Sequence, residues 1–442
     1  MPKLLLIQPT QYAHDGSLCK QKKIYLPCLS LPLLASMTPK NWDVSIKIEV
    51  VDNINFDEDV DLVGIGTMGH AIFRALDIAK EFKKRGKIVF FGGYMASMVS
   101  EKVLSSGYVD SVVIGDAEIS YPLLCKDYED KGNLERIYNH PISKLENLPL
   151  PKYELLLEKP IGNMLPVQAG RGCPHSCKFC SIACLYKGKY LTRPVKEVIR
   201  DIKKIKELGF NSFYLIDDNI VGNPKYLEQL VKEIKPLNMT WSSQCSLNLA
   251  KNRELLKLVA SSGCRILSFG IESISQEGLD KLNKKWVNVK EHKKLLAIIE
   301  SEGIMPSTEM IVGTDSDTEQ SLKDTYKFVE HSKIPIPRFY ILTPMPSTEL
   351  YNQYKSENRL LHEDYIRYDG TQCVHRPEQI SPEKLTEMYW WLYKKVFSLK
   401  SIVKRTLLKK NMLFRPKTYL FAFFINLHYR RYILKQNVPN IF

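Results

Sequence analysis

The sequence predicts an α/β protein in three parts: a doubly wound parallel sheet, a partial (β/α)6 barrel and a C-terminal helical region. Two features of the chain predict this class. Short apolar runs alternate with patterns that repeat every three or four residues, which is the alternation of strand and helix. The strand candidates are apolar along almost their whole length, as strands are when helices cover both faces of a parallel sheet.

The first predicted domain covers residues 1–132. The clearest helical pattern lies at residues 71–85, and the apolar runs predict strands at 3–9, 46–52, 61–67, 87–93 and 110–116. Sheets of this class bind ligands at the carboxyl ends of their strands. Glycines gather at those ends, which fits either a ligand-binding edge or ordinary turns. They are Gly64, Gly66, Gly92, Gly93 and Gly115.

A second alternating region covers residues 164–346, after a proline-containing linker at 133–163. Six strand candidates separated by helical patterns fit an open barrel, because a closed eight-stranded barrel needs about 250 residues. Residues 347–442 then form a helical region with a basic, aromatic tail. The six strand candidates are 165–169, 212–217, 240–246, 265–271, 307–312 and 339–343.

The sequence also indicates in which compartment the protein is expected. No run of about 18 uncharged apolar residues is present, so we expect no transmembrane helix. The opening MPKLLLIQPTQ resembles a first strand more than a secretory signal. We therefore expect a cytoplasmic protein, in which clustered cysteines bind metal more often than they form disulfides.

The net charge of +14 is concentrated in the tail, because residues 400–442 contain ten Lys or Arg and no Asp or Glu. Aromatic and basic residues together fit an anionic membrane surface, single-stranded nucleic acid, or a helical layer with a solvated basic face. No RNA-binding extension is recognisable, which disfavours nucleic acid. The helical layer is the favoured interpretation, with peripheral contact with the inner membrane surface as the alternative. The aromatic residues are Phe414, Tyr419, Phe421, Phe423, Phe424, Tyr429, Tyr432 and Phe442.

The chemistry is expected at GRGCPHSCKFC, directly after the first barrel strand. Cys173, Cys177 and Cys180 form a Cx3Cx2C array that can hold an iron–sulfur cluster and leave one iron open for a substrate. A structural zinc site completed by His175 is the alternative. The spacing of Cys184 makes it a separate, unligated thiol.

With Phe179 before the last cysteine, the motif resembles that of the radical S-adenosylmethionine (SAM) superfamily. The order of domains resembles its cobalamin-binding branch, in which a flavodoxin-like domain precedes the partial barrel. The likeness extends to about residue 400. It includes 115–118 (GDAE), 215–220 (LIDDNI), 270–273 (GIES), 311–319 (IVGTDSDTE), 342–348 (LTPMPST) and 357–370 (ENRLLHEDYIRYDG).

The resemblance implies that Cys173, Cys177 and Cys180 hold a [4Fe–4S] cluster whose open iron chelates SAM. It implies contacts to SAM from strand-end residues and from Phe179. Two of these have simpler explanations, since an Asp-Asp-Asn run can cap a helix and Glu272 can form a salt bridge at the barrel rim. The implied SAM residues are Phe179, Asp217, Asp218, Asn219, Glu272, Ser273, Ile311 and Gly313.

Cobalamin domains of this shape often carry a DxHxxG loop whose histidine ligates cobalt. The corresponding stretch here is QPTQYAHDGSLCK, which contains His14 in a different order, so we expect cobalamin without a protein histidine on cobalt. His70 beside the next turn fits a helix start better than a ligand. A cofactor-free domain is the alternative. The implied cobalamin contacts are Thr67, Gly92, Gly93, Gly115 and Glu118.

The resemblance therefore implies an enzyme. A reduced cluster would cleave SAM to a 5′-deoxyadenosyl radical, with an electron from a donor such as flavodoxin or ferredoxin. With methylcobalamin the reaction would be methylation of an unactivated carbon in a lipid or natural product; without it, a cyclisation, coupling or rearrangement. A zinc-stapled nucleic-acid-binding module is the non-enzymatic alternative.

Overall fold

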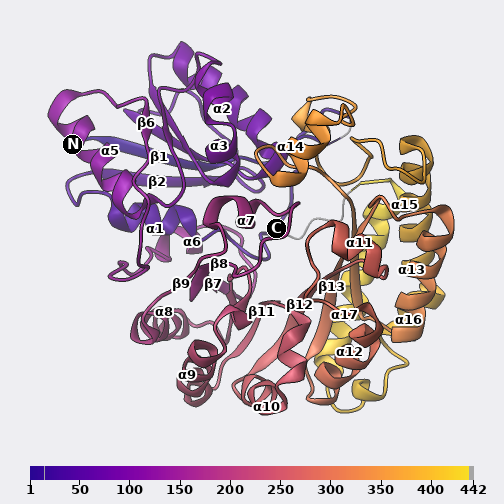
Figure 1. Ribbon diagram of the computed structural model, residues 1–442. Helices are drawn as coiled ribbons and strands as arrows, with labels where there is room; N and C mark the ends of the chain where they lie inside the picture. Colours follow the sequence, from indigo (N-terminus) through magenta and orange to yellow (C-terminus); the bar gives the residue numbers. More distant parts are fainter. Residues whose placement is uncertain (14, 438–442) are drawn as a thin grey trace. The chain divides into compact units, whose positions relative to one another are not determined.

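The computed structural model describes residues 1–13 and 15–437 (Figure 1). His14 and Phe442, which the sequence analysis considered, lie outside the described residues. The chain divides into two compact units, each containing a parallel sheet. The first comprises Met1–Val167 and Leu191–Phe210, and the second comprises Gln168–Tyr190 and the chain from Asn211 onward.

The N-terminal sheet is parallel, with the strand order β2-β1-β3-β4-β5-β6. This order confirms the doubly wound class, and it reverses at β1 and β3, where such sheets bind ligands. The five predicted strands are present, and β6 adds a sixth of two residues. The strands are β1 Lys3–Gln8, β2 Asp43–Ile48, β3 Leu62–Gly66, β4 Ile88–Gly92, β5 Ser111–Val113 and β6 Ile137–Tyr138.

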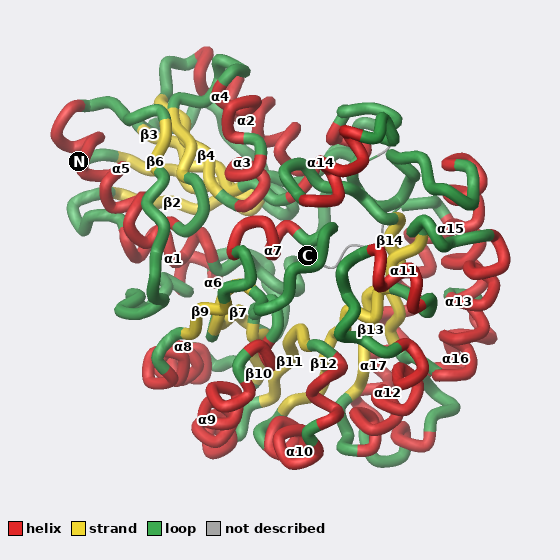
Figure 2. The backbone as a smooth tube through the Cα atoms, in the orientation of Figure 1, coloured by secondary structure: helices red, strands yellow, loops and turns green. Residues whose placement is uncertain are grey.

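Helices cover both faces of this sheet. Figure 2 shows α2 and α3 on one face and α1 and α5 on the other. The helix predicted at 71–85 is α2, whose apolar side chains are buried at the predicted three- and four-residue spacing. The helices of this unit are α1 Ser30–Met37, α2 Ile72–Lys84, α3 Tyr94–Met98, α4 Ser100–Leu104, α5 Ala117–Lys131, α6 Glu154–Leu157 and α8 Val195–Glu207.

The second sheet has the order β14-β13-β12-β11-β10-β7, which is the sequential order of a partial barrel. The neighbours from β10 to β14 pair in parallel. A short ribbon of β8 (Gly170–Gly172) and β9 (Tyr190–Thr192) is present in addition to the predicted strands. The sheet strands are β7 Leu165–Val167, β10 Ser212–Leu215, β11 Thr240–Cys245, β12 Cys264–Glu272, β13 Met305–Val312 and β14 Ile336–Ile341.

The two faces of these strands differ in polarity. Alternate side chains such as Phe213, Phe269 and Phe339 are fully buried. The other face carries polar groups, among them Glu309 of β13, which accepts hydrogen bonds from Ser268 of β12 at 2.7 Å and from Arg338 Nε of β14 at 2.8 Å. The helices between the strands are α9 Pro224–Ile234, α10 Arg253–Ser261, α11 Gln276–Lys281, α12 His292–Ser301 and α13 Glu319–Ser332.

The C-terminal region is helical, as predicted, and it protects the edge strand β14. The hydroxyl of Tyr393 accepts from Phe339 N at 2.9 Å and donates to Phe339 O at 2.9 Å, which satisfies edge groups that no further strand pairs. None of the described helices has both the length and the apolar character to span a bilayer. The helices are α14 Glu349–Ser356, α15 Pro382–Val396, α16 Leu399–Arg405 and α17 Pro416–Leu434.

Candidate active site

The three motif cysteines lie on one loop at the end of β8. Cys180 directly precedes helix α7 (Ser181–Tyr186), and its backbone N–H donates to Cys177 O at 3.1 Å in a tight turn. All ten cysteines lie within the described residues and are free thiols, with Cys173, Cys177 and Cys180 partly exposed. Among the described residues, no three or more His, Cys, Asp or Glu side chains are grouped so that they could hold a metal ion.

The side chains after β10 hold the chain that leads into this loop. Asp217 accepts from Ala169 N and from the Tyr190 hydroxyl, both at 2.9 Å. Asp218 accepts from Gly172 N at 2.7 Å. Both carboxylates therefore anchor the backbone that precedes Cys173.

Asn219, which follows Asp218 in the chain, contacts the cysteine loop itself. Its amide group donates to Cys173 Sγ at 3.8 Å, and its Oδ1 accepts from Ser246 N at 3.1 Å. Helix α9 is instead capped by Asn223, so the Asp-Asp-Asn run does not act as the cap of that helix. The sequence placed these residues at a strand end but gave no sign that they contact the cysteine loop.

Burial shifts the protonation of groups around the loop. It raises the pKa of Asp217 to about 6, against the opposing effect of its hydrogen-bond donors. It also raises the pKa of the Cys177 thiol to about 12, while the nearby Lys284 ammonium lowers it. Thiolates bind metal, so a bound cation must displace these protons.

Glu272 ends β12 in a left-handed backbone conformation, with φ +62°. Such a conformation is uncommon for a residue with a side chain and is concentrated at functional sites. Its Oε1 accepts from Lys284 Nζ at 2.7 Å in a nearly buried ion pair, so the rim salt bridge considered above is present. Ser273 beside it is buried, and its hydroxyl accepts from Ser275 N at 3.0 Å.

An aromatic stack lies next to these groups. The rings of His175 and Trp286 are parallel, with centroids 3.8 Å apart, and Lys284 Nζ lies 5.3 Å from the Trp286 centroid. The imidazole considered as a fourth zinc ligand is thus held by stacking. Nothing in the linear sequence pairs these two residues.

Phe179 and Ile311 share a buried neighbourhood, although 132 positions separate them in the sequence. Both pack against one buried cluster. The sequence assigned both to SAM, and the structure places the cysteine loop and the end of β13 against the same apolar surface. The cluster consists of Leu282, Leu342, Leu350 and Tyr354.

Gly313, just after β13, must be glycine. Its φ is +93°, and a Cβ there would lie 2.5 Å from Leu385 Cδ2. Its N–H donates to Asp317 Oδ2 at 2.9 Å, and its carbonyl accepts from His375 Nε2 at 3.0 Å. Side chains therefore hold the peptide groups on both sides of Gly313.

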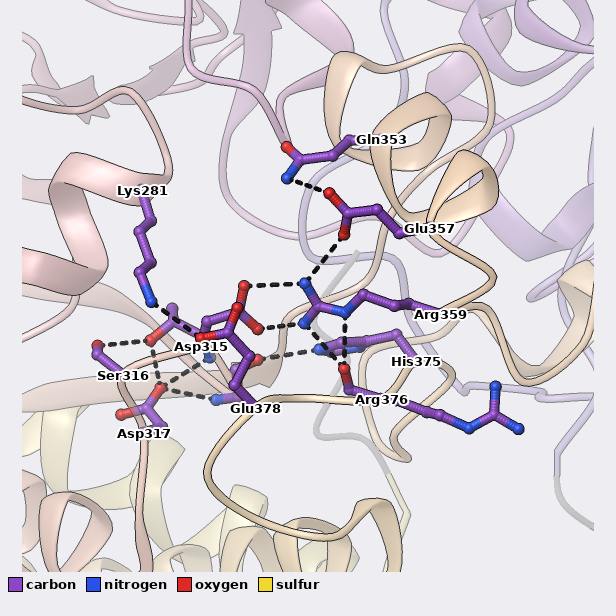
Figure 3. A network of polar contacts seen from close by, with 12 residues as sticks. Lys281, Asp315, Ser316, Asp317, Gln353, Glu357, Arg359, His375, Arg376 and Glu378 are labelled. Carbon is purple, nitrogen blue, oxygen red and sulfur yellow. Dashed lines mark hydrogen bonds and ion pairs between the residues drawn. The ribbon is translucent and has the colours of Figure 1, made fainter.

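Figure 3 shows a polar network that includes Asp315, Arg359 and His375. Arg359 forms an ion pair with Asp315 and donates to Arg376 O at 2.8 and 2.9 Å. Its guanidinium lies 4.1 Å from the Tyr354 ring centroid, and His375 stacks on the same ring at 5.1 Å. Residues 359–376 thereby join the end of β13 to α14. Sequence reasoning included this segment only as a motif and assigned it no role.

In the N-terminal unit, Thr67 joins the ends of β3 and β4. It is fully buried; its hydroxyl donates to Gly92 O at 2.9 Å and accepts from Ala96 N at 3.0 Å. Gly93 has φ +93°, and a Cβ there would lie 2.6 Å from Thr67 O. The structure thus brings Thr67, Gly92 and Gly93 together.

Gly115 belongs to the same edge, because Ser97 accepts from Gly115 N and donates to Gly93 O, both at 2.9 Å. Space is open there: a Cβ on Gly92 or Gly115 would meet no atom within 4 Å. Glu118 follows in the first turn of α5. These positions form an accessible edge at the carboxyl ends of β4 and β5.

Gln8 is a further candidate that sequence reasoning missed. It ends β1, and its Oε1 is buried without a hydrogen-bond partner among the described residues. A buried acceptor left unpaired is costly, which makes it a place for a ligand donor. His70 lies in the short helix Gly69–Ala71, the position expected for it.

Comparison with known proteins agrees with this architecture. The radical SAM superfamily matches residues 167–329. A bacteriochlorophyllide d C-12(1)-methyltransferase of Chlorobaculum tepidum is 28% identical over 413 residues, which cover 91% of this chain and 89% of that protein. A hopanoid C-2 methylase of Rhodopseudomonas palustris is 26% identical over 371 residues, covering 80% and 69%.

The solved structure of the cobalamin-dependent SAM radical enzyme OxsB, with aqua-cobalamin and SAM bound, has the same fold. Its TM-score is 0.70 at 14% identity, covering 98% of this chain and 73% of that one. The resemblance inferred from the motifs is confirmed: residues 167–329 form a radical SAM domain. Such a domain implies a [4Fe–4S] cluster and SAM.

Proposed function

We propose that this chain, which is a radical SAM enzyme, methylates an unactivated carbon of a small-molecule substrate with cobalamin as the methyl carrier. The observation that carries the methylation is the open glycine edge at the carboxyl ends of β4 and β5, in a chain that also contains the cysteine loop. Similarity to curated methyltransferases along most of the chain supports it.

We assign Cys173, Cys177 and Cys180 as the ligands of the [4Fe–4S] cluster. Three free thiols on one anchored loop fit a cluster that keeps an iron open for SAM. When bound, cluster and SAM supply a radical able to remove hydrogen from an unactivated carbon. Asp217, Asp218 and Asn219 keep the loop in place, and the run also offers acceptors to the methionyl ammonium of SAM.

We place the remaining proposed SAM contacts around the ends of β12 and β13. Phe179 and Ile311 would cover adenine with apolar surface, next to the fixed backbone at Gly313. Glu272 would accept from the ribose hydroxyls through Oε2, since its ion pair with Lys284 uses Oε1. Ser273 would line the same side.

For cobalamin we propose contacts from Thr67, Gly92, Gly93, Gly115 and Glu118, with no histidine of the protein on cobalt. The flat face of a corrin needs close approach to backbone, which glycines allow. The buried Oε1 of Gln8 would accept from an amide of the ligand. We assign this role to residues 1–132, with 133–163 as linker, 164–346 as catalytic domain and 347–442 as C-terminal region.

We propose a lipid or natural-product substrate. The relatives named above act, by their names, on a bacteriochlorophyllide and a hopanoid, which are both large ring systems. The electron would come from a small carrier such as flavodoxin or ferredoxin.

Anaerobic reconstitution with iron, sulfide and hydroxocobalamin tests the proposal. The wild type should bind both cluster and corrin, and SAM with a CD3 methyl group should yield a product that carries an intact CD3 unit, because the carrier transfers the whole methyl group. Gly92→Ala should keep the corrin, whereas Gly92→Leu should lose it and keep the iron, because its side chain fills the open edge. A wild type that binds cluster but no corrin would instead indicate radical cyclisation, coupling or rearrangement.

A further inference from the structure

Helix α17 is apolar around most of its circumference, and one side of it is buried. It contacts α15 and α16 (Figure 1). A helix that is apolar all round is normally enclosed on every side. The exposure of the side of α17 opposite its buried residues therefore needs an explanation. The buried residues are Tyr419, Ala422, Ile425, Asn426, Tyr429 and Ile433.

Polar contacts fix the orientation of the helix. The Asn426 amide donates to Pro335 O at 3.0 Å, and Arg405 Nη2 donates to Asn426 Oδ1 at 3.2 Å. The Tyr419 hydroxyl donates to Glu300 Oε1 at 2.5 Å. The tail is therefore a structural layer of the second unit, one of the three alternatives that the sequence left open, and rotation of α17 would break all three contacts.

The opposite side presents large apolar side chains to solvent. Phe421 and Phe424 on the helix are 47% and 62% exposed, and Leu413 and Phe414 just before it are 81% and 74% exposed. Leu420 and Leu434 are exposed on the same side. Several large apolar side chains exposed along one helix are typical of an interaction site.

Basic residues accompany this apolar surface. Lys417, Phe424 and Arg431 follow at intervals of seven residues, which places them on one side of the helix. Lys435 continues the row, and Lys410 precedes it. Within the described chain no carboxylate pairs with these cations, and residues 400–442 contain no Asp or Glu.

Other cations of the tail are used internally. Lys404 pairs with Glu330 at 3.1 Å and Lys409 pairs with Glu300 at 2.7 Å, while Arg405 is fully buried. The charge available to a partner is thus concentrated beside the exposed aromatic rings.

We propose that this side of α17, together with Leu413 and Phe414, docks on the surface of a bilayer that contains anionic lipid. Phenylalanine and leucine would enter the interface between headgroups and acyl chains while lysine and arginine meet the headgroup charge. A symmetric contact with a second copy would place like charges opposite one another, which disfavours it. The proposal is independent of the methylation chemistry.

Co-sedimentation of the full-length protein with vesicles tests the surface. Vesicles of phosphatidylcholine with phosphatidylglycerol should pellet the wild type at low salt, and added salt should release it because screening shortens the charge range to about 8–10 Å. Phe421→Ser/Phe424→Ser should bind about tenfold more weakly or worse. Lys417→Glu/Arg431→Glu should remove the preference for anionic lipid.

Leu157→Ser, on exposed apolar surface of α6, is the matched control and should bind as the wild type does. Circular dichroism checks that the variants fold; point changes are preferable to truncation because removal of α17 would expose Phe397 and Arg405, which are fully buried and contact this helix. Failure of the wild type to pellet with anionic vesicles overturns the proposal. So does concentration-dependent dimerisation abolished by Phe421→Ser/Phe424→Ser, which would show that a second copy covers the surface.

Discussion

The Nε2 of His375 donates a hydrogen bond to the carbonyl oxygen of Gly313 over 3.0 Å, and it links a segment beyond the barrel to the end of β13. Burial lowers the pKa of His375 to about 4, so the ring is neutral at physiological pH. A neutral ring with its proton on Nε2 can donate to a carbonyl. Gly313 lies beside Ile311, where we place the adenine of SAM.

His375 should therefore act as a positioning residue for SAM. We expect His375→Leu to raise the Kd for SAM about fivefold to tenfold, as loss of one buried hydrogen bond would. His375→Gln, whose amide can also donate, should recover most of the affinity. Equilibrium dialysis of the cluster-loaded protein measures Kd, and iron content should be equal in all three proteins. Equal Kd values for His375→Leu and the wild type would contradict this role.

Of the four cysteines in and before α7, we expect three to be required for cluster assembly and one to be dispensable. Alanine at Cys173, Cys177 or Cys180 should abolish cluster assembly, because each removes one of the proposed thiolates. Cys184→Ala should keep the cluster, since its Sγ donates to Ser347 O at 3.1 Å and is engaged elsewhere. Iron and sulfide content with absorbance near the cluster bands measures this. Loss of cluster in Cys184→Ala would indicate a fourth protein ligand.

The sequence predicted the strands well where apolar runs were long enough to show a period. It missed β6 and the β8–β9 ribbon, because two or three residues cannot display one. It also predicted that Phe179 and Asp217 belong to the site, from motif positions. It could not predict that Asp218 anchors Gly172 or that Arg359 pairs with Asp315, because those contacts depend on how distant segments return in space.

Asp217 should make the stability of the cluster-free protein depend on pH. Its pKa is raised from 3.8 to about 6 by burial, so the folded state binds a proton more tightly than the unfolded state. Stability should therefore fall as pH rises from about 4 to about 6, by about 3 kcal/mol. Urea unfolding across this range measures the slope, which Asp217→Asn should flatten. Exposed Asp130→Asn controls for net charge, and an unchanged slope in Asp217→Asn would contradict the assignment.

Variants of the Glu272–Lys284 ion pair can distinguish its contribution to folding stability from a contribution of Glu272 to SAM binding. Both side chains are nearly buried, so Lys284→Met leaves a buried carboxylate without its cation and should cost about 3–5 kcal/mol. Glu272→Gln/Lys284→Met removes both charges and should recover most of that loss. If Glu272 also accepts from the ribose of SAM, the double variant should be stable and yet bind SAM more weakly than the wild type. Unfolding midpoints and SAM dialysis on the same preparations measure both effects, and a stable double variant with wild-type affinity would show that Glu272 only holds the barrel rim.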